Sequence, residues 1–415
     1  MTKYFRVLLV CSSLAWALAI TSSTIVGRSG ATEAPTGFDG LTNGHILLQS
    51  DFDAARLTFE ERDDITKGLG PVYNAQSCAE CHQTLVTGGV SQVTELRAGH
   101  FDGHNFVPHP GGSLINDRAT DASIQEHVLP GNEVTTLRTS LNTLGDGFVE
   151  AIDDQTLIDI SNSQPAGMRG QVIQVPIAEA TSGVTRVGRF GWKGQQASLL
   201  SFASDAYLNE QGITNRFNLV ENTSNGRLVN FPPFDLVPDN QPCTFAALGI
   251  CGEDPDDDIT QFAEFMRATK APSRGPNTAD VVAGSAVFDA IGCNTCHVRK
   301  IVTAPVGTPL NGGQLVVSSA LGNKIIHPFG DFLLHNVGTG DGIVQNGGPA
   351  SRNRMRTAPL WGVRTRSRLM HDGRSLTLTD AILRHGGEAL PVTLKFELLL
   401  NNRERNQLLA FVGSL

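Results

Sequence analysis

The sequence has little charge and few large aromatic residues. Of its 415 residues, 18% are charged, and only three are Tyr and three Trp. With 41 acidic against 32 basic residues, the net charge is −9. The chain therefore lacks the basic surface typical of nucleic-acid-binding proteins, and it shows no fixed repeat period. Because 40% of the residues are hydrophobic, a disordered chain is also excluded. The length predicts two or three globular domains.

Long hydrophobic runs are almost absent. Lys3 and Arg6 precede an apolar run from Val7 to Ile20, and Ala17-Leu18-Ala19 is a small-residue cleavage site. The run is shorter than the roughly 20 residues that span a bilayer. We therefore expect a secretory signal peptide over residues 1–19, or at most to about residue 30, and a periplasmic or secreted mature protein. An uncleaved membrane anchor is the alternative.

Cysteine is scarce enough for each residue to be placed. Cys11 lies in the expected signal peptide, and four others form two C-x-x-C-H motifs, Cys78 to His82 and Cys293 to His297. This motif attaches c-type haem: two thiols bond to the porphyrin and the adjacent histidine binds the iron. A zinc site or a redox dithiol would leave both histidines unexplained. The sequence predicts two covalently bound haem c groups, attached through Cys78, Cys81, Cys293 and Cys296, with His82 and His297 as proximal ligands.

The last two cysteines, Cys243 and Cys251, flank seven residues. Exported proteins form disulfides, so we expect these two to pair, with a contribution of roughly 2–3 kcal/mol. The acidic run 253–258 follows them. We interpret it as a solvated turn that begins a helix, because acids favour that end of a helix. A metal site in this run is the alternative.

Helical periodicity is clearest near the C-terminus. Thr278 can cap a helix that carries Val281 and Phe288 on one side and ends at Gly292, and a second apolar helix is expected over 403–415. A helix before C-x-x-C-H and another at the chain end are typical of class I cytochromes c. We predict a mainly α fold with long irregular loops, made of two cytochrome c-like haem domains of which the N-terminal one is elaborated. The expected divisions are an N-terminal haem domain over 45–240, a linker with the disulfide over 241–274 and a C-terminal haem domain over 275–415.

The remaining expectations are local. Short helices are expected near 51–67, 153–162 and 259–269, a small hairpin within 170–190, and loops over 83–150.

Further motifs accompany the two haem motifs in a defined order. They are Gly68-Leu69-Gly70-Pro71, Gly188 to Lys193, Asn209 to Ile213, Thr357 to Gly362, His371-Asp372-Gly373-Arg374 and His385 to Ala389. Over about residues 45–415 the chain resembles the bacterial di-haem oxidoreductase family, whose members are described as peroxidases or thiol oxidoreductases. More distantly it is similar to dihaem cytochrome c peroxidases, the dihaem enzyme of methylamine utilisation and dihaem rubber oxygenases.

The resemblance implies two unlike haems. In the peroxidases one haem is six-coordinate and transfers electrons, and the other has an open face at which peroxide reacts. The distal ligand of the C-terminal haem follows the H-D-G histidine by about fourteen residues, a position held here by His385, where peroxidases commonly have Met. We expect His297 and His385 to bind the same iron, at a lower potential than a His/Met pair gives. From the residues alone, His385 could equally end a short helix before Gly386.

The resemblance also assigns roles near the first haem. Trp192 matches the tryptophan that relays electrons between the haems, and Glu210 matches the acid that moves a proton of bound peroxide. Without the resemblance, Trp192 could be a core residue and Glu210 a surface acid. The distal side of the His82 haem is expected to be open, although four loop histidines follow the motif: His100, His104, His109 and His127.

Two further expectations concern the arginines near the H-D-G motif and a calcium ion. Some of the arginines around the H-D-G motif are expected to pair with haem propionates; they are Arg364, Arg366, Arg368 and Arg374. The peroxidases also hold a calcium ion between their domains. The sequence has no convincing match to the residues that bind it, so calcium is possible but unsupported.

The expected function is that of an exported dihaem c-type oxidoreductase, peroxidase-like in its chemistry. Electrons would come from an external donor such as a small cytochrome, a cupredoxin or a quinol-linked protein, and peroxide or O₂ would be the small-molecule substrate. One alternative is a dihaem oxygenase that acts on an apolar substrate. The other is a non-catalytic electron-transfer cytochrome, which the long non-haem segments argue against. We expect no nucleic-acid partner and no membrane span after signal cleavage.

Overall fold

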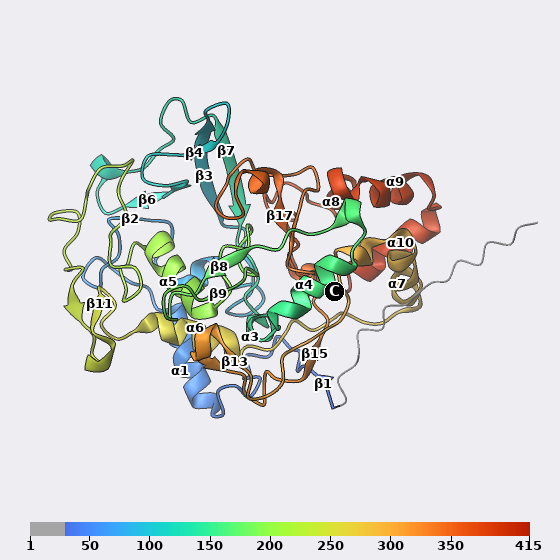
Figure 1. Cartoon of the computed structure of the whole chain (residues 1–415), viewed down its shortest axis with the longest axis horizontal. Coiled ribbons are helices and arrows are strands. Elements are labelled where there is room, and N and C mark those ends of the chain that lie inside the picture. Colours follow the sequence, from blue (N-terminus) through green and yellow to red (C-terminus); the bar gives the residue numbers. More distant parts are fainter. Residues whose placement is uncertain (1–29) are drawn as a thin grey trace, which may run out of the picture.

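A computed structural model describes residues 30–415 of the chain, so the predicted signal peptide lies outside the described residues. Within this range the chain forms an elongated molecule (Figure 1). Four helices gather at one end of it: α7 (Ala279–Ile291), α8 (Leu378–Leu383), α9 (Leu390–Leu398) and α10 (Asn402–Val412). No helix in residues 30–415 has the length and apolar character needed to cross a bilayer.

The larger core lies in the other half of the molecule. Its helices are α1 (Gln49–Glu60), α3 (Asp146–Glu150), α5 (Leu199–Ala206) and α6 (Asp258–Ala268). Phe52 and Phe59 of α1 pack on Phe265 of α6, with ring centroids 5.4 and 4.9 Å apart. The segment 241–274, expected as a linker, thus contributes a helix to this core, and strands from residues 301–326 join it as well.

Helix α1 is shorter than the expected helix over 51–67. It ends at Glu60, and the following residues turn around Asp64, whose carboxylate accepts a hydrogen bond from the Thr66 N–H at 2.8 Å. Such a bond offers the backbone an alternative to the helix. The other expected helices lie close to their predicted positions, as α4 (Asp154–Ser163) and α6.

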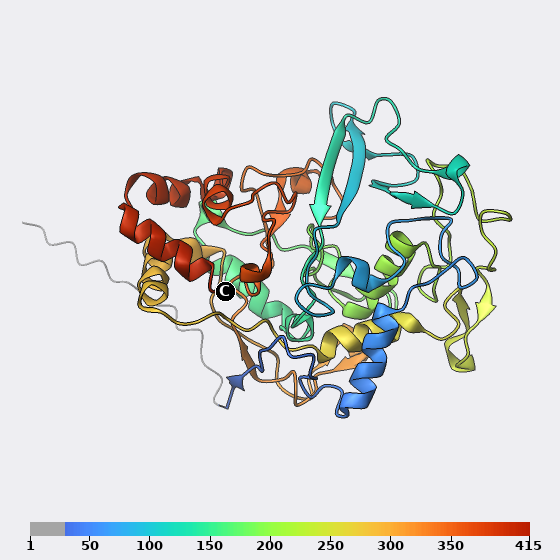
Figure 2. The same ribbon diagram turned by 180° about the vertical axis from the view of Figure 1, so that it is seen from behind.

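The expectation of a mainly α fold holds only in part, because residues expected as loops form a four-stranded antiparallel sheet. Its strands are β3 (Thr94–Phe101), β4 (Phe106–Pro108), β5 (Leu114–Ile115) and β7 (Val134–Thr139). Glu95 of β3 pairs with Arg138 of β7. Both views show these strands beside the C-terminal half (Figures 1 and 2), and the Thr139 N–H donates to the His371 carbonyl. The sheet escaped prediction because its strands carry charged residues, such as the buried Arg138, where a packed sheet face usually carries apolar ones.

The remaining elements are short. The hairpin expected within 170–190 is formed by β8 (Gln174–Pro176) and β9 (Thr185–Val187). Next to the acidic run, β10 (Gln241–Pro242) pairs with β11 (Ile250–Gly252), and Cys243 and Cys251 are joined by a disulfide. The others are β1 (Thr32–Glu33), β2 (Val72–Tyr73), α2 (Cys78–Cys81), β6 (Arg118–Ala119), β12 (Ile301–Val302), β13 (Pro309–Leu310), β14 (Leu315–Val316), β15 (Lys324–Ile326), β16 (Leu334–His335) and β17 (Met355–Arg356).

The first and last helices of the C-terminal part, both expected from the sequence, pack on each other. The Thr278 hydroxyl caps α7 by accepting from the Val281 N–H, and Gly292, with φ 98°, ends the helix directly before Cys293. Phe288 of α7 meets Phe411 of α10 edge to face at 5.2 Å. A side chain at Gly284 would place its Cβ 1.8 Å from the Gln407 carbonyl oxygen. The close approach of α7 and α10 therefore requires glycine there.

Replacing Gly284 by alanine should destabilise the C-terminal part. The added methyl must push α7 away from the α10 backbone, and overpacking of this kind costs about 1–3 kcal/mol. Thermal unfolding of the holoprotein measures the loss as a lower Tm. Val282→Ala, on the exposed side of the same helix, is the matched control and should shift Tm far less. Equal Tm values for Gly284→Ala and wild type would contradict the packing described here.

Candidate haem sites and the residues between them

The first C-x-x-C-H motif borders a large hollow in the N-terminal half. Cys78, Cys81 and His82 line a space of about 1430 Å³, including its open mouth. Neither cysteine forms a disulfide with another cysteine of residues 30–415. The His82 Nδ1 lies 3.3 Å from the Gly89 carbonyl oxygen. A carbonyl only accepts hydrogen bonds, so Nδ1 carries the proton and Nε2 keeps the lone pair that a metal needs.

The second motif borders a hollow of about 1320 Å³ between α7, α8 and α10. His297 and His385 both line it, with ring centroids 6.4 Å apart. The Nδ1 of His297 lies 3.0 Å from the Phe329 carbonyl oxygen, and that of His385 lies 2.7 Å from the Ala381 carbonyl oxygen. Each imidazole therefore has Nε2 free as a ligand. Two imidazoles on one metal, with bonds of about 2.0–2.1 Å, would have their centroids roughly 6.3 Å apart, so the pair fits one iron.

Trp192 lines both hollows. Its Nε1–H donates to the Thr139 carbonyl oxygen at 2.8 Å, and its ring meets the His371 imidazole edge to face at 6.1 Å. The indole is 8% exposed. It is therefore held in one orientation by β7 on one side and by the H-D-G motif on the other. Arg356 and Pro359 also border both spaces.

Lys193, the residue after Trp192, fixes the tryptophan-containing segment in place. Lys193 is fully buried and pairs with Asp341 at 2.7 Å, while its Nζ also donates to three carbonyl oxygens, those of Ser351, Arg352 and Arg354. Asp341 pairs in turn with Arg138 at 2.8 Å. A buried charge is stable only when it is paired and hydrogen-bonded. This network joins the tryptophan segment to the sheet and to the C-terminal half.

Glu210 lies in the wall of the first hollow. It belongs to a π-helical turn, Tyr207–Gln211, which continues α5; such turns are frequent at functional sites. The Asn74 side-chain amide donates to its carboxylate at 2.8 Å. Burial and the charge of Glu95 raise the pKa of Glu210 to about 8. Burial opposes the charge of Glu95, but the Arg97 guanidinium, 2.8 Å away, lowers the pKa of its carboxyl group. Glu210 thus has a carboxyl group suited to exchanging a proton near neutral pH.

None of the four loop histidines considered for the first haem borders its hollow. His104 and His127 are exposed, and His100 lies in β3 outside the lining. His109 is buried, but its ring nitrogens contact the Pro110 carbonyl and the Leu129 N–H. Among the described residues that line this hollow, His82 is the only histidine.

The arginines that line the hollows differ from those expected. Of the four near the H-D-G motif, only Arg366 lines a hollow; Arg364, Arg368 and Arg374 are exposed. Those that sequence reasoning missed are Arg97, Arg138 and Arg356. Arg97 and Arg138 lie in the unexpected sheet, and Arg356 precedes the Thr-Ala-Pro motif by one residue. No local pattern distinguishes them from surface arginines.

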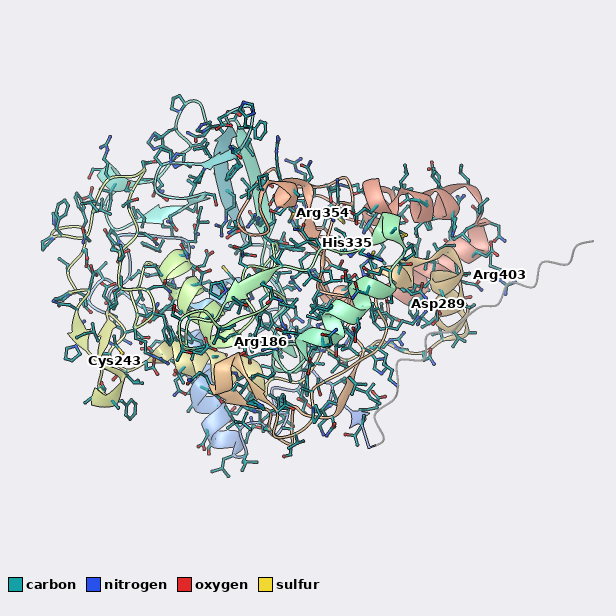
Figure 3. All side chains as sticks on the ribbon, viewed as in Figure 1. Arg186, Cys243, Asp289, His335, Arg354 and Arg403 are labelled. Atoms are coloured by element: carbon teal, nitrogen blue, oxygen red, sulfur yellow. A yellow bond between two sulfur atoms is a disulfide. The ribbon has the colours of Figure 1, made fainter. Side chains whose placement is uncertain are left out.

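His335 is another residue of the second hollow that the sequence analysis did not identify. It lines the second hollow, with Nε2 2.9 Å from Asp331 and Nδ1 2.9 Å from Glu388. Burial opposes its charge, but the hydrogen bonds with Asp331, Cys296 and Glu388 raise its pKa to about 12. Arg354 completes the cluster through Glu388 at 2.8 Å, and Figure 3 shows His335 and Arg354 near each other in the middle of the molecule. An imidazolium next to Cys296 places positive charge at the wall of this site.

Comparison with family models decides the classification. A model described as "Di-haem oxidoreductase, putative peroxidase" matches residues 84–415. The chain belongs to this family. It is therefore a haem-dependent oxidoreductase with two haem groups, which confirms the resemblance inferred from the motifs. The match begins just after the first C-x-x-C-H motif, so that motif is supported by the geometry around His82 and not by the family model.

Curated proteins gave no match. Solved structures that resemble the chain include hydrazine synthase of Kuenenia stuttgartiensis, at 13% identity and a TM-score of 0.38, with both chains covered completely. Another is a MauG-like protein associated with microbial copper homeostasis, at 14% identity and a TM-score of 0.41, covering 97% of this chain and 95% of that one.

Proposed function

We propose that this oxidoreductase is an exported, peroxidase-like enzyme with two covalently attached haem c groups. One would be attached to Cys78 and Cys81 with His82 as proximal ligand, and the other to Cys293 and Cys296 with His297 and His385 as its two axial ligands. The observation that carries the proposal is the asymmetry of the hollows: the second contains a facing pair of histidines, and the first contains one histidine and Glu210.

The haem groups, when bound, supply one-electron transfer and the cleavage of peroxide. The protein supplies positioning and protons. Trp192 is fixed by its hydrogen bond to Thr139 and by the His371 ring, so its indole stays between the two sites as an electron relay. Glu210, held by Asn74, takes a proton from the substrate at its carboxylate and returns it to the leaving oxygen, the role of a general acid–base. Electrons would enter from an external donor, a small cytochrome, a cupredoxin or a quinol-linked protein.

Two measurements on the purified ferric holoprotein test this function. Low-temperature EPR should show one low-spin and one high-spin haem, and peroxide should be consumed in the presence of a reduced small cytochrome or cupredoxin. Two low-spin haems in the oxidised protein, and a remaining ferric haem that stays low-spin after half-reduction, without peroxide consumption, would instead indicate an electron carrier. A stable ferrous–oxygen complex and an oxygenated apolar product would indicate the oxygenase.

Replacing Trp192 by phenylalanine should slow peroxide turnover by about tenfold or more, a barrier increase of at least about 1.4 kcal/mol. The phenyl ring keeps most of the packing but loses the indole that lies between the hollows. Trp361 offers a matched control, because it is also buried but lines neither hollow. Stopped-flow assays of Trp192→Phe and Trp361→Phe should differ in rate while their haem content stays the same. Equal rates would exclude the relay.

A further inference from the structure

Four acidic side chains from three separate segments converge at the end of the molecule away from the C-terminal helices. They are Glu221, Asp235, Asp239 and Glu253, and each offers a carboxylate oxygen within 4.8 Å of the others. None of them lines either haem hollow. Glu253 follows Cys251 of the disulfide by two residues, and Figure 3 shows Cys243 at the opposite end of the molecule from Arg403.

In the described part of the chain, each of the two glutamates of this cluster has one carboxylate oxygen with a hydrogen-bond partner and one without. The Oε2 of Glu253 accepts from the Thr214 N–H at 2.9 Å and from its hydroxyl at 3.1 Å, whereas Oε1 has no hydrogen-bond partner within residues 30–415. In Glu221, Oε1 accepts from the Asn222 N–H at 2.6 Å, and Oε2 has no partner among the residues that the structure describes. Glu221 is 6% exposed and Glu253 is 4% exposed. Buried polar atoms of this kind are normally satisfied.

No positively charged side chain within residues 30–415 pairs with the cluster. Asp257, in the same acidic run, pairs with Arg216 at 2.6 Å. In the described part of the chain, by contrast, none of the four clustered acids forms an ion pair with a lysine, arginine or histidine. Buried carboxylates at such distances repel each other, and proteins keep them charged by pairing them or by binding a metal. The unpartnered oxygens and the unpaired negative charges of the cluster both favour the binding of a cation.

We propose that Glu221, Asp235, Asp239 and Glu253 bind one Ca²⁺ ion. The donor atoms are all oxygens, which excludes metals that prefer sulfur or nitrogen. Ca²⁺ takes six to eight oxygen ligands in flexible geometry, whereas Mg²⁺ usually keeps several waters and binds one or two carboxylates. Four carboxylates therefore suit Ca²⁺. This site is separate from both haem hollows, and the assignment does not depend on the peroxidase proposal.

The position of the site suggests a structural role. Thr214, which holds Glu253, lies three residues after the π-helical turn that carries Glu210. The ion would tie this segment to the loop 235–239 and to the disulfide-linked strands. Bound Ca²⁺ stabilises only the folded state, and so should raise the unfolding temperature.

Calorimetric titration of the chelator-treated holoprotein with CaCl₂ tests the assignment. The double variant Asp235→Asn/Asp239→Asn should lose one equivalent of bound Ca²⁺ and the Ca²⁺-dependent rise in Tm. Both residues are half-buried at the rim of the cluster, so the change to amides is mild. Asp256→Asn is the matched control, because Asp256 is an exposed acid of the same run outside the cluster. It should bind Ca²⁺ as the wild type does.

Calcium held elsewhere would remain in the double variant, so only the loss of one equivalent supports this site. An unchanged stoichiometry and an unchanged Tm response in the double variant would overturn the proposal. A Tm increase with MgCl₂ as large as that with CaCl₂ would overturn the choice of calcium. If the double variant does not fold, Asp235→Asn alone decides: an affinity at least tenfold weaker than that of the wild type supports the site, and an unchanged affinity overturns it.

Discussion

Replacing His385 by alanine should convert the second haem from six-coordinate low-spin to high-spin. His385 faces His297 at the separation that one iron requires, with its Nδ1 held by the Ala381 carbonyl. Alanine removes that ligand and leaves the α8 backbone in place. Low-temperature EPR of the ferric holoprotein should show the low-spin signal of this haem disappear. His385→Met should keep six ligands and raise the reduction potential by on the order of 0.1 V, because a thioether raises it.

The control for this prediction is a second histidine of the same hollow. His371 lines it as well, but its ring meets Trp192 and not His297. His371→Phe should therefore leave the second haem low-spin. If His385→Ala also keeps an unchanged low-spin signal, another residue binds the iron and the His297/His385 assignment is wrong.

The parts of the structure that sequence patterns predicted are those determined by local interactions. The cap at Thr278, the apolar positions of α7 and the terminating Gly292 lie within one helix, so their pattern is visible in the sequence. Each C-x-x-C-H motif is equally local. Trp192 and Glu210 were found only through motifs shared with a family, because neither has a local signature; the structure places both beside the first motif.

What escaped prediction depends on contacts between distant segments. Arg138 meets Asp341, about 200 residues further on, and His335 meets Glu388. Residues of the acidic run 253–258 have two different structural roles. Asp254 accepts a hydrogen bond from the Asp258 N–H at the start of α6, as expected for a helix N-terminus. Glu253 points instead toward acids 14 to 32 residues earlier in the chain. Such partners become neighbours only when the fold is known.

Replacing Glu210 by glutamine should lower peroxide turnover by roughly 10²–10⁴-fold, the usual contribution of a general acid–base residue. Glutamine keeps the size of the side chain and can still contact Asn74, but it cannot accept and return a proton. Steady-state kinetics with a reduced donor should show kcat/KM fall while both haem spectra stay as in the wild type. Glu397→Gln, an exposed acid on α9 away from both hollows, controls for the change in charge.

The pH dependence separates a proton-transfer role from a structural one. The pKa of Glu210 is raised to about 8 by burial and by the charge of Glu95, so the carboxylate form that accepts a proton becomes more abundant as the pH rises toward that value. For the wild type, kcat/KM should therefore increase with pH and level off above about 8. In Glu210→Gln this ascending limb should be absent, because the amide does not titrate. A variant that is slow but keeps the ascending limb would mean that another group accepts the proton and that Glu210 only positions it.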